Sequence, residues 1–196
     1  MFKKASCLLI ILGLFAINPI WAQSKWTIDQ AHSKIGFSVT HLLISEVEGN
    51  FKVFTGTIVS AKPDFTNAVI EFSVDVASIN TDNEMRDKHL KSPDFFDAEK
   101  YPKATFKSTS LKLISGNKYE LTGKFSLHGV EKDAKFDVTF GGTAKVGNSV
   151  KAGFRATTVL NRFDYDLKWN KLTEAGGATV GKDVTIDLKL EFSQIN

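Results

Sequence analysis

The chain has 196 residues, 42% of them hydrophobic and 24% charged, and 25 basic residues stand against 22 acidic ones. This near-balance of charge gives no reason to expect a nucleic acid or a strongly acidic partner. The length favours a single domain.

The first 22 residues have the layout of a secretory signal peptide. Lys3 and Lys4 precede an apolar run at residues 8–17, and Ala22 supplies the small residue of a cleavage site. The apolar run is shorter than the ~20 residues of a comfortable membrane span. We therefore expect cleavage after Ala22, a periplasmic location and a mature chain, residues 23–196, that folds as one domain without a transmembrane segment.

The mature chain would contain no cysteine, because Cys7 is the only one in the sequence. Thiol catalysis and disulfides are thereby excluded, and a large core has to stabilise the exported protein instead. Removal of Lys3 and Lys4 lowers the formal net charge from +3 to +1.

Alternating apolar and polar residues predict strands in the first part of the mature chain. A short strand at 26–28 is followed by a polar turn at 29–33, and then by alternating segments at 34–41 and 70–76. The apolar members of these two segments are Ile35, Phe37, Val39, His41, Ile70, Phe72, Val74 and Val76.

The strand-like segment at 51–59 changes phase, since Phe51 and Phe54 have opposite parity. A bulge near Gly49 or Gly56 would reconcile the two positions.

One insertion interrupts the strand pattern. Residues 82–91 predict a short helix, because Thr81 and Glu84 fit a capping box and Pro93 ends the segment. Three acid–base pairs at i,i+4 spacing would support it, namely Asp82–Arg86, Glu84–Lys88 and Asp87–Lys91. The loop that follows, residues 93–102, carries Phe95, Phe96 and Tyr101.

Strands resume in the second half and are separated by short turns. We predict them at 104–113, 119–127, 134–140, 150–158 and 184–192. Between the last two, residues 162–174 are irregular and contain Trp169, and residues 175–177 form a flexible link.

The pattern predicts an all-β fold of eight or nine antiparallel strands with one apolar face. That face has to be covered, either by a second sheet or by closure into a barrel, and periodicity alone does not choose between them. We expect an eight-stranded antiparallel barrel, with the short helix and the loop after it over the rim. Such a barrel is wide enough either to fill with side chains or to hold one small ligand.

Four groups of residues, in one order along nearly the whole mature chain, are distinctive together. They are Trp26-Thr27-Ile28-Asp29 with His32-Ser33 and His41-Leu42; Gly49-Asn50-Phe51 with Phe54 and Gly56; Ser78-Ile79-Asn80-Thr81 with Arg86-Asp87, His89-Leu90-Lys91-Ser92, Phe95-Phe96-Asp97 and Tyr101-Pro102; and Leu121-Thr122-Gly123 with Leu127-His128-Gly129-Val130. In these groups the chain resembles the YceI-like family. The segment after Arg162 departs from the family, in which a glycine often follows.

The resemblance implies a periplasmic protein with a lipocalin-like barrel around an elongated apolar cavity. It implies binding of a long isoprenoid, such as an isoprenoid quinone, or of a fatty-acyl lipid. It implies neither catalysis nor a cofactor, and it leaves the ligand of this chain open.

The inward phenylalanines are the candidate lining of such a cavity, although the same residues could simply fill the interior. The candidates are Phe37, Val39, Phe54, Ile70, Phe72, Phe106, Phe125, Phe136 and Phe154.

Polar candidates lie near the predicted cavity mouth. His41 is on the apolar phase of its strand, either as a hydrogen-bonded structural histidine or as a contact to a ligand head group. Arg86 and His89 on the short helix either fix the helix by local pairs or guard the entrance. Met85, Phe95 and Phe96 would form an apolar lip. The remaining histidines have no zinc-like spacing, so we expect no metal site.

Three functions from different classes follow. The first is a periplasmic carrier or reservoir for a long apolar lipid. The second is a filled barrel that acts through its surface as a stress-linked interaction module. The third is a lipid-modifying enzyme, although the sequence has none of the common catalytic motifs. Exposed rim aromatics are compatible with a homodimer, but no feature requires one.

Overall fold

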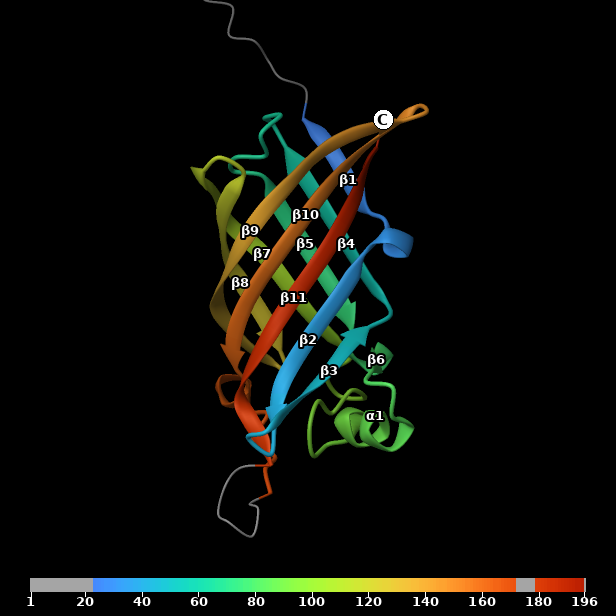
Figure 1. Cartoon of the computed structure of the whole chain (residues 1–196), viewed down its shortest axis with the longest axis vertical. Helices are drawn as coiled ribbons and strands as arrows, with labels where there is room; N and C mark the ends of the chain where they lie inside the picture. Colours follow the sequence, from blue (N-terminus) through green and yellow to red (C-terminus); the bar gives the residue numbers. More distant parts are fainter. Residues whose placement is uncertain (1–22, 172–178, 196) are drawn as a thin grey trace, which may run out of the picture.

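The computed structural model describes residues 23–171 and 179–195 (Figure 1). The expected signal peptide at 1–22 and the expected flexible link at 175–177 lie outside the described residues.

Most of the described chain is antiparallel sheet, as the alternation predicts. The strands are β1 (Ser24–Ile28), β2 (Lys34–His41), β3 (Ser45–Phe51), β4 (Phe54–Ser60), β5 (Val69–Asp75), β6 (Ile79–Asn80), β7 (Lys103–Ser115), β8 (Lys118–Leu127), β9 (Val130–Val146), β10 (Ser149–Asn161) and β11 (Val180–Ile195). The helical elements are η1 (Gln30–His32), η2 (Val76–Ser78), α1 (Glu84–Lys91) and η3 (Arg162–Tyr165).

The sheet closes into a barrel because β1 pairs with both β4 and the final strand, β11. The ring of paired strands is β1-β4-β5-β7-β8-β9-β10-β11, which gives the expected eight. The three extra strands extend this wall at one end: β2 continues along β11 where β1 stops, and β3 and β6 pair in turn beside it. Closure leaves the central strands without exposed edges.

The phase change between Phe51 and Phe54 is a break in the strand, not a bulge at a glycine. β3 ends at Phe51, and β4 begins at Phe54 after two intervening residues. Ser78 holds this corner, since its hydroxyl accepts a hydrogen bond from the Val53 amide at 3.0 Å.

One end of the barrel is closed by the connection between β4 and β5. Phe65 in this connection is 1% exposed and packs against Trp26, Phe140 and Phe154, with ring centroids 5.2–5.3 Å apart. The Tyr119 hydroxyl donates to the Asp64 carbonyl at 2.8 Å and ties the connection to the wall. The barrel is therefore plugged at this end.

The opposite end carries α1 and the loop after it, as Figure 1 shows at the bottom of the barrel. At this end β6 pairs with β3, and α1 and the loop follow β6 in the chain before β7 begins. The expected short helix over the rim is therefore present.

The expected capping of the helix is wrong in detail. α1 begins at Glu84, and Asn83 caps it by accepting a hydrogen bond from the Arg86 amide at 3.0 Å. Thr81 instead binds side chains of the helix, which removes it from the capping box. None of the three expected i,i+4 ion pairs is formed among the described residues, and in two of these pairs the Arg86 or Asp87 side chain bonds to Thr81 instead.

No helix in the described part of the chain is long and apolar enough to span a lipid bilayer.

Candidate ligand-binding cavity

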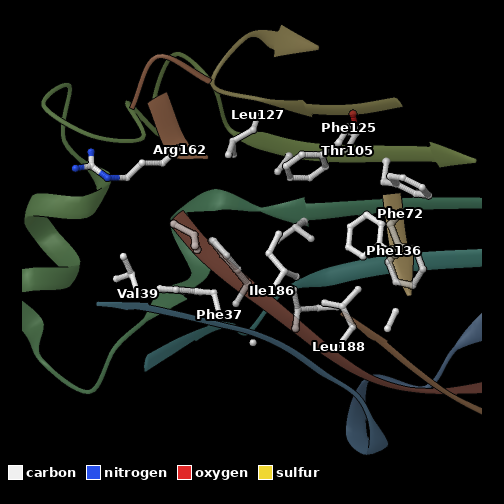
Figure 2. Close-up of a pocket in the computed structure, with 18 of the residues that line it drawn as sticks. Phe37, Val39, Phe72, Thr105, Phe125, Leu127, Phe136, Arg162, Ile186 and Leu188 are labelled. Atoms are coloured by element: carbon white, nitrogen blue, oxygen red, sulfur yellow. The ribbon is translucent and has the colours of Figure 1, made fainter. Parts of the chain in front are cut away.

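The barrel interior holds a cavity of about 360 Å³ whose walls are almost wholly apolar. Figure 2 shows rings and aliphatic side chains from opposite walls pointing into it, among them Phe72, Phe125, Phe136, Ile186 and Leu188. A cavity of roughly 10–15 Å³ is large enough to hold one water molecule. The interior is therefore hollow, which agrees with the expected cavity and contradicts the alternative of a filled barrel.

Most of the residues predicted from the sequence lie on the cavity wall. These are Phe37, Val39, His41, Ile70, Phe72, Arg86, His89, Phe95, Phe96, Phe106, Phe125, Phe136 and Phe154. The structure places them together around one space, and their contact with a ligand stays a prediction.

Two predicted residues, Phe54 and Met85, do not line the cavity. Phe54 at the start of β4 is 3% exposed and packs against other core residues. Its side chain therefore does not border the cavity. Met85 is 82% exposed, because α1 presents Met85 to solvent and presents Arg86 and His89 to the barrel. An apolar lip that includes Met85 is therefore not formed.

The lining rings support one another and stiffen the wall. Phe106 packs edge-on against Phe136 at 5.3 Å, and Phe125 against Tyr165 at 5.5 Å. Such aromatic pairs add about 0.5–1.5 kcal/mol each beyond the area that they bury.

An aromatic cluster lies at the α1 end of the cavity, opposite the Phe65 plug, and we call this unplugged end the open end. The His89 ring on α1 packs against both Phe95 and Trp169, with centroid distances of 5.3 and 5.1 Å, and Phe95 and Trp169 are themselves 5.1 Å apart, so the three rings form a triangle. Trp169 comes from the segment that follows β10 and η3, so the cluster joins this segment to α1. In the sequence, Trp169 lies in an irregular segment. Without alternating residues, the sequence does not predict the direction of its side chain.

Thr81 holds α1 against the barrel. Its hydroxyl accepts from Arg86 Nε at 2.8 Å and donates to the Asp87 carboxylate, while Arg86 Nη2 donates to the Thr81 carbonyl at 2.7 Å. Thr81 is only 5% exposed. This network fixes the Arg86 guanidinium at the cavity wall.

Arg162 also lines the cavity, although it is not among the site residues predicted from the sequence. It is 4% exposed, and its guanidinium donates to four backbone carbonyls: Nε to Gly181 at 2.8 Å, Nη1 to Leu167 and Trp169, and Nη2 to Val180 at 3.2 Å. Burial lowers the pKa of this guanidinium from its ordinary value. Figure 2 shows it directed toward the α1 side of the cavity.

The polar groups of the lining gather at this open end and are cationic or neutral. Arg86, His89, Arg162 and His41 contribute to the wall, and the described lining residues include no aspartate or glutamate. The arrangement can therefore donate hydrogen bonds to a head group that carries acceptor oxygens, while the rest of the cavity accepts only apolar chain.

A second polar cluster lies outside the cavity, at the corner between β1 and β2. Lys151 Nζ lies 2.7 Å from Asp29 and 3.4 Å from Glu191, and His32 Nδ1 lies 3.2 Å from Asp29. The group Asp29, His32 and Glu191 has the spacing of metal ligands. The Lys151 ammonium, however, already supplies the positive charge between the two carboxylates, and together with the His32 side chain it lowers the pKa of Asp29 to about 2.

Comparison with known proteins gives one consistent result. The family model described as the YceI-like domain matches residues 26–192. A UPF0312 protein of Staphylococcus aureus strain N315 is 36% identical over 172 residues, which cover 87% of this chain and 98% of that protein.

Solved structures agree with the fold. The crystal structure of Burkholderia cenocepacia BcnA superposes with a TM-score of 0.71 at 26% identity, covering 84% of this chain and 98% of BcnA. A polyisoprenoid binding domain from Saccharophagus degradans has a TM-score of 0.60 at 17% identity, covering 85% and 97%, and at that identity shares the fold alone.

Proposed function

The chain belongs to the YceI-like domain family, and from this premise we propose that it is a lipid-binding protein that holds one long apolar molecule in its barrel. The observation that carries the proposal is the cavity of about 360 Å³, whose walls are almost wholly apolar. The ligand class is an isoprenoid quinone-like or fatty-acyl lipid, held for transport or storage. The polyisoprenoid-binding function of the Saccharophagus domain, which has this fold, supports the isoprenoid class.

The apolar walls suit a hydrocarbon tail. Each methylene transferred from water to such a wall contributes about 0.8 kcal/mol, so a tail of a dozen carbons reaches useful affinity without any polar contact. The stiff aromatic lining also lowers the entropy that binding has to remove, because the wall does not need to be ordered by the ligand.

The open end gives the ligand its orientation. Arg86 and the two histidines offer hydrogen-bond donors there, Arg162 has one N–H beyond its four backbone bonds, and the Phe65 plug closes the other end. We expect the tail to point toward Phe65 and the head group to lie near His89. In this orientation His41 would contact the head group, which is the second of the two roles expected from the sequence.

The predicted signal peptide supports a periplasmic location, which is part of the proposal. The proposed activity is lipid binding and not catalysis. The proposal includes a role for this lipid carrier in a stress response.

Native mass spectrometry of protein purified from its own host tests these points together. The protein mass should correspond to the chain that begins at Gln23, and a second species should exceed it by the mass of one lipid. Recovery of the unprocessed chain would contradict the periplasmic assignment. Protein that is always ligand-free, and that takes up neither quinones nor fatty amides, would contradict lipid binding.

Substitution of Phe125→Trp tests the cavity itself. The larger ring enters the space that the ligand would use, so we expect uptake of the fluorescent fatty acid cis-parinaric acid to fall by about tenfold, which corresponds to ~1.4 kcal/mol. The urea midpoint should change little, because a roomy cavity tolerates the added volume. Val159→Trp places the same indole ring at a 61% exposed position away from the cavity and should bind like the parent. A loss of about 1–3 kcal/mol of stability in Phe125→Trp, with binding unchanged, would indicate an overpacked core and no ligand site.

A further inference from the structure

The turn between β2 and β3 exposes three consecutive large aliphatic side chains. Leu42, Leu43 and Ile44 are 40%, 71% and 85% exposed. Isolated exposed apolar residues are ordinary, but three in a row at one projecting turn are not.

The backbone of this turn is unfavourable for the residues that it contains. Leu42 and Leu43 have φ of 52° and 64°, and the Ile44 amide donates to the His41 carbonyl at 3.2 Å. Two successive residues with positive φ define the hairpin turn for which Asn-Gly is preferred, because a Cβ crowds the backbone in this region. A turn that only reversed the chain would therefore be more stable with asparagine and glycine, and strain of this kind commonly marks a functional segment.

The turn stands at the open end of the cavity. Val39 and His41 before it and Val47 after it line the cavity. The Leu42 amide donates to the Thr179 carbonyl at 2.9 Å, and Thr179 is itself a lining residue. Figure 1 shows this hairpin reaching the same end of the barrel as α1, where Met85 adds a fourth exposed apolar side chain.

The shape of the tip identifies its partner. Three aliphatic side chains cover at most roughly 400 Å² between them, and a stable protein interface takes about 800 Å² from each partner. A single convex tip is therefore too small for a second copy of the chain, but it can enter a fluid hydrocarbon layer without a complementary surface. Insertion of a few apolar side chains at a bilayer interface gives the weak, reversible contact that a carrier needs.

We propose that Leu42, Leu43 and Ile44 form a membrane-docking tip that seats the open end of the barrel on a lipid bilayer, so that a lipid can pass between the bilayer and the cavity without crossing water. The purpose of the contact rests on the proposed function, but the contact itself is a separate property and can be measured without any cavity ligand.

The test uses the mature chain and vesicles of phosphatidylethanolamine and phosphatidylglycerol. In the triple variant Leu42→Asn, Leu43→Gly and Ile44→Ser the turn receives its preferred residues, so the fold should be at least as stable as the parent. Co-flotation with vesicles should fall by at least about tenfold, since interfacial affinity scales with inserted apolar area. Transfer of cis-parinaric acid between protein and vesicles should slow to a similar degree.

The matched control removes exposed apolar residues at the plugged end. Leu113→Asn with Ile114→Ser changes side chains that are 45% and 63% exposed and should leave flotation and transfer unchanged. Equilibrium binding of cis-parinaric acid without vesicles should be the same in the parent and in the triple variant, because none of the three residues lines the cavity.

Several outcomes would overturn the docking tip. They are a parent protein that does not float with vesicles, a triple variant that floats and transfers like the parent, and an equal loss in the control. A concentration-dependent dimer that disappears in the triple variant would assign the tip to a second copy instead. If the parent floats but never takes up cis-parinaric acid, the proposed function fails and the tip stands.

Discussion

Arg162 shows how a buried charge organises the open end of the barrel. Moving a guanidinium out of water is costly, and here four backbone carbonyls offset that cost without a carboxylate among the described residues. The same four bonds hold the segment after η3 against the start of β11. Arg162 thus positions Trp169 and forms cavity wall at the same time.

Substitution of Arg162→Met should destabilise the fold by roughly 3 kcal/mol or more, because it leaves buried carbonyls without donors. Arg162→Lys should restore only part of the loss, since an ammonium lacks the planar fork that reaches several acceptors. Urea unfolding of the three proteins measures both effects. Arg155→Met at an exposed position is the control and should change stability by about 0.5 kcal/mol or less. Equal, small effects at Arg162 and Arg155 would show that the four bonds contribute little.

At the scale of elements, the contact between β3 and the segment before α1 sets how closely the helix lies on the barrel. Gly49 faces both Phe37, which lines the cavity, and Thr81, which holds the helix. A Cβ at position 49 would lie 2.3 Å from Phe37 Cζ and 2.8 Å from Thr81 Cγ2. Glycine is therefore required here by the close packing of three elements.

Gly49→Ala should move the Phe37 ring into the cavity and loosen the Thr81 network. We expect a loss of about 1–3 kcal/mol in stability and faster release of cis-parinaric acid. The matched variant Gly153→Ala has no atom within 4 Å of the new Cβ and should leave both properties near those of the parent. Urea titration and stopped-flow release measure them. Unchanged release in Gly49→Ala would mean that Phe37 does not bound the ligand.

At the scale of the whole molecule, closure of the barrel depends on contacts between the ends of the described chain. β1 pairs with β11, and at the corner after β1 the Lys151 ammonium bridges Asp29 and Glu191. The Lys151 and His32 side chains lower the pKa of Asp29 from 3.8 to about 2. Because the folded pKa lies below the unfolded one, the contribution of Asp29 to stability is present above about pH 4 and is lost as the pH falls toward 2.

Asp29→Asn should therefore flatten the acid limb of the stability curve. The parent is expected to lose stability more steeply than the variant between about pH 4 and pH 2, and the two curves should converge at the acid end. Urea midpoints measured across this range test the expectation, with Asp137→Asn at an exposed site as the control. Parallel curves for Asp29→Asn and the parent would exclude this linkage. A homodimer stays a prediction, and sedimentation of the same samples measures it.

Several features were readable from the sequence because they are local. Alternation at 34–41, 119–127 and 184–192 put one set of side chains on each face, and the structure confirms the strands there. The same alternation selected Phe37, Phe72 and Phe136 for the interior, where they lie. The resemblance to a family added the closed barrel, which periodicity alone left open between a barrel and a sandwich.

Only the tertiary structure decided which interior residues line a space and which fill it. Phe54 and Phe72 look alike in the sequence, but one is packed in the wall and the other borders the cavity. Phe65, Arg162 and Trp169 lie in turns and irregular segments, where no period indicates direction, and they form the plug and the polar end. A period of two fixes the face of a side chain, whereas a hollow depends on the distance between walls that meet only when β1 pairs with β11.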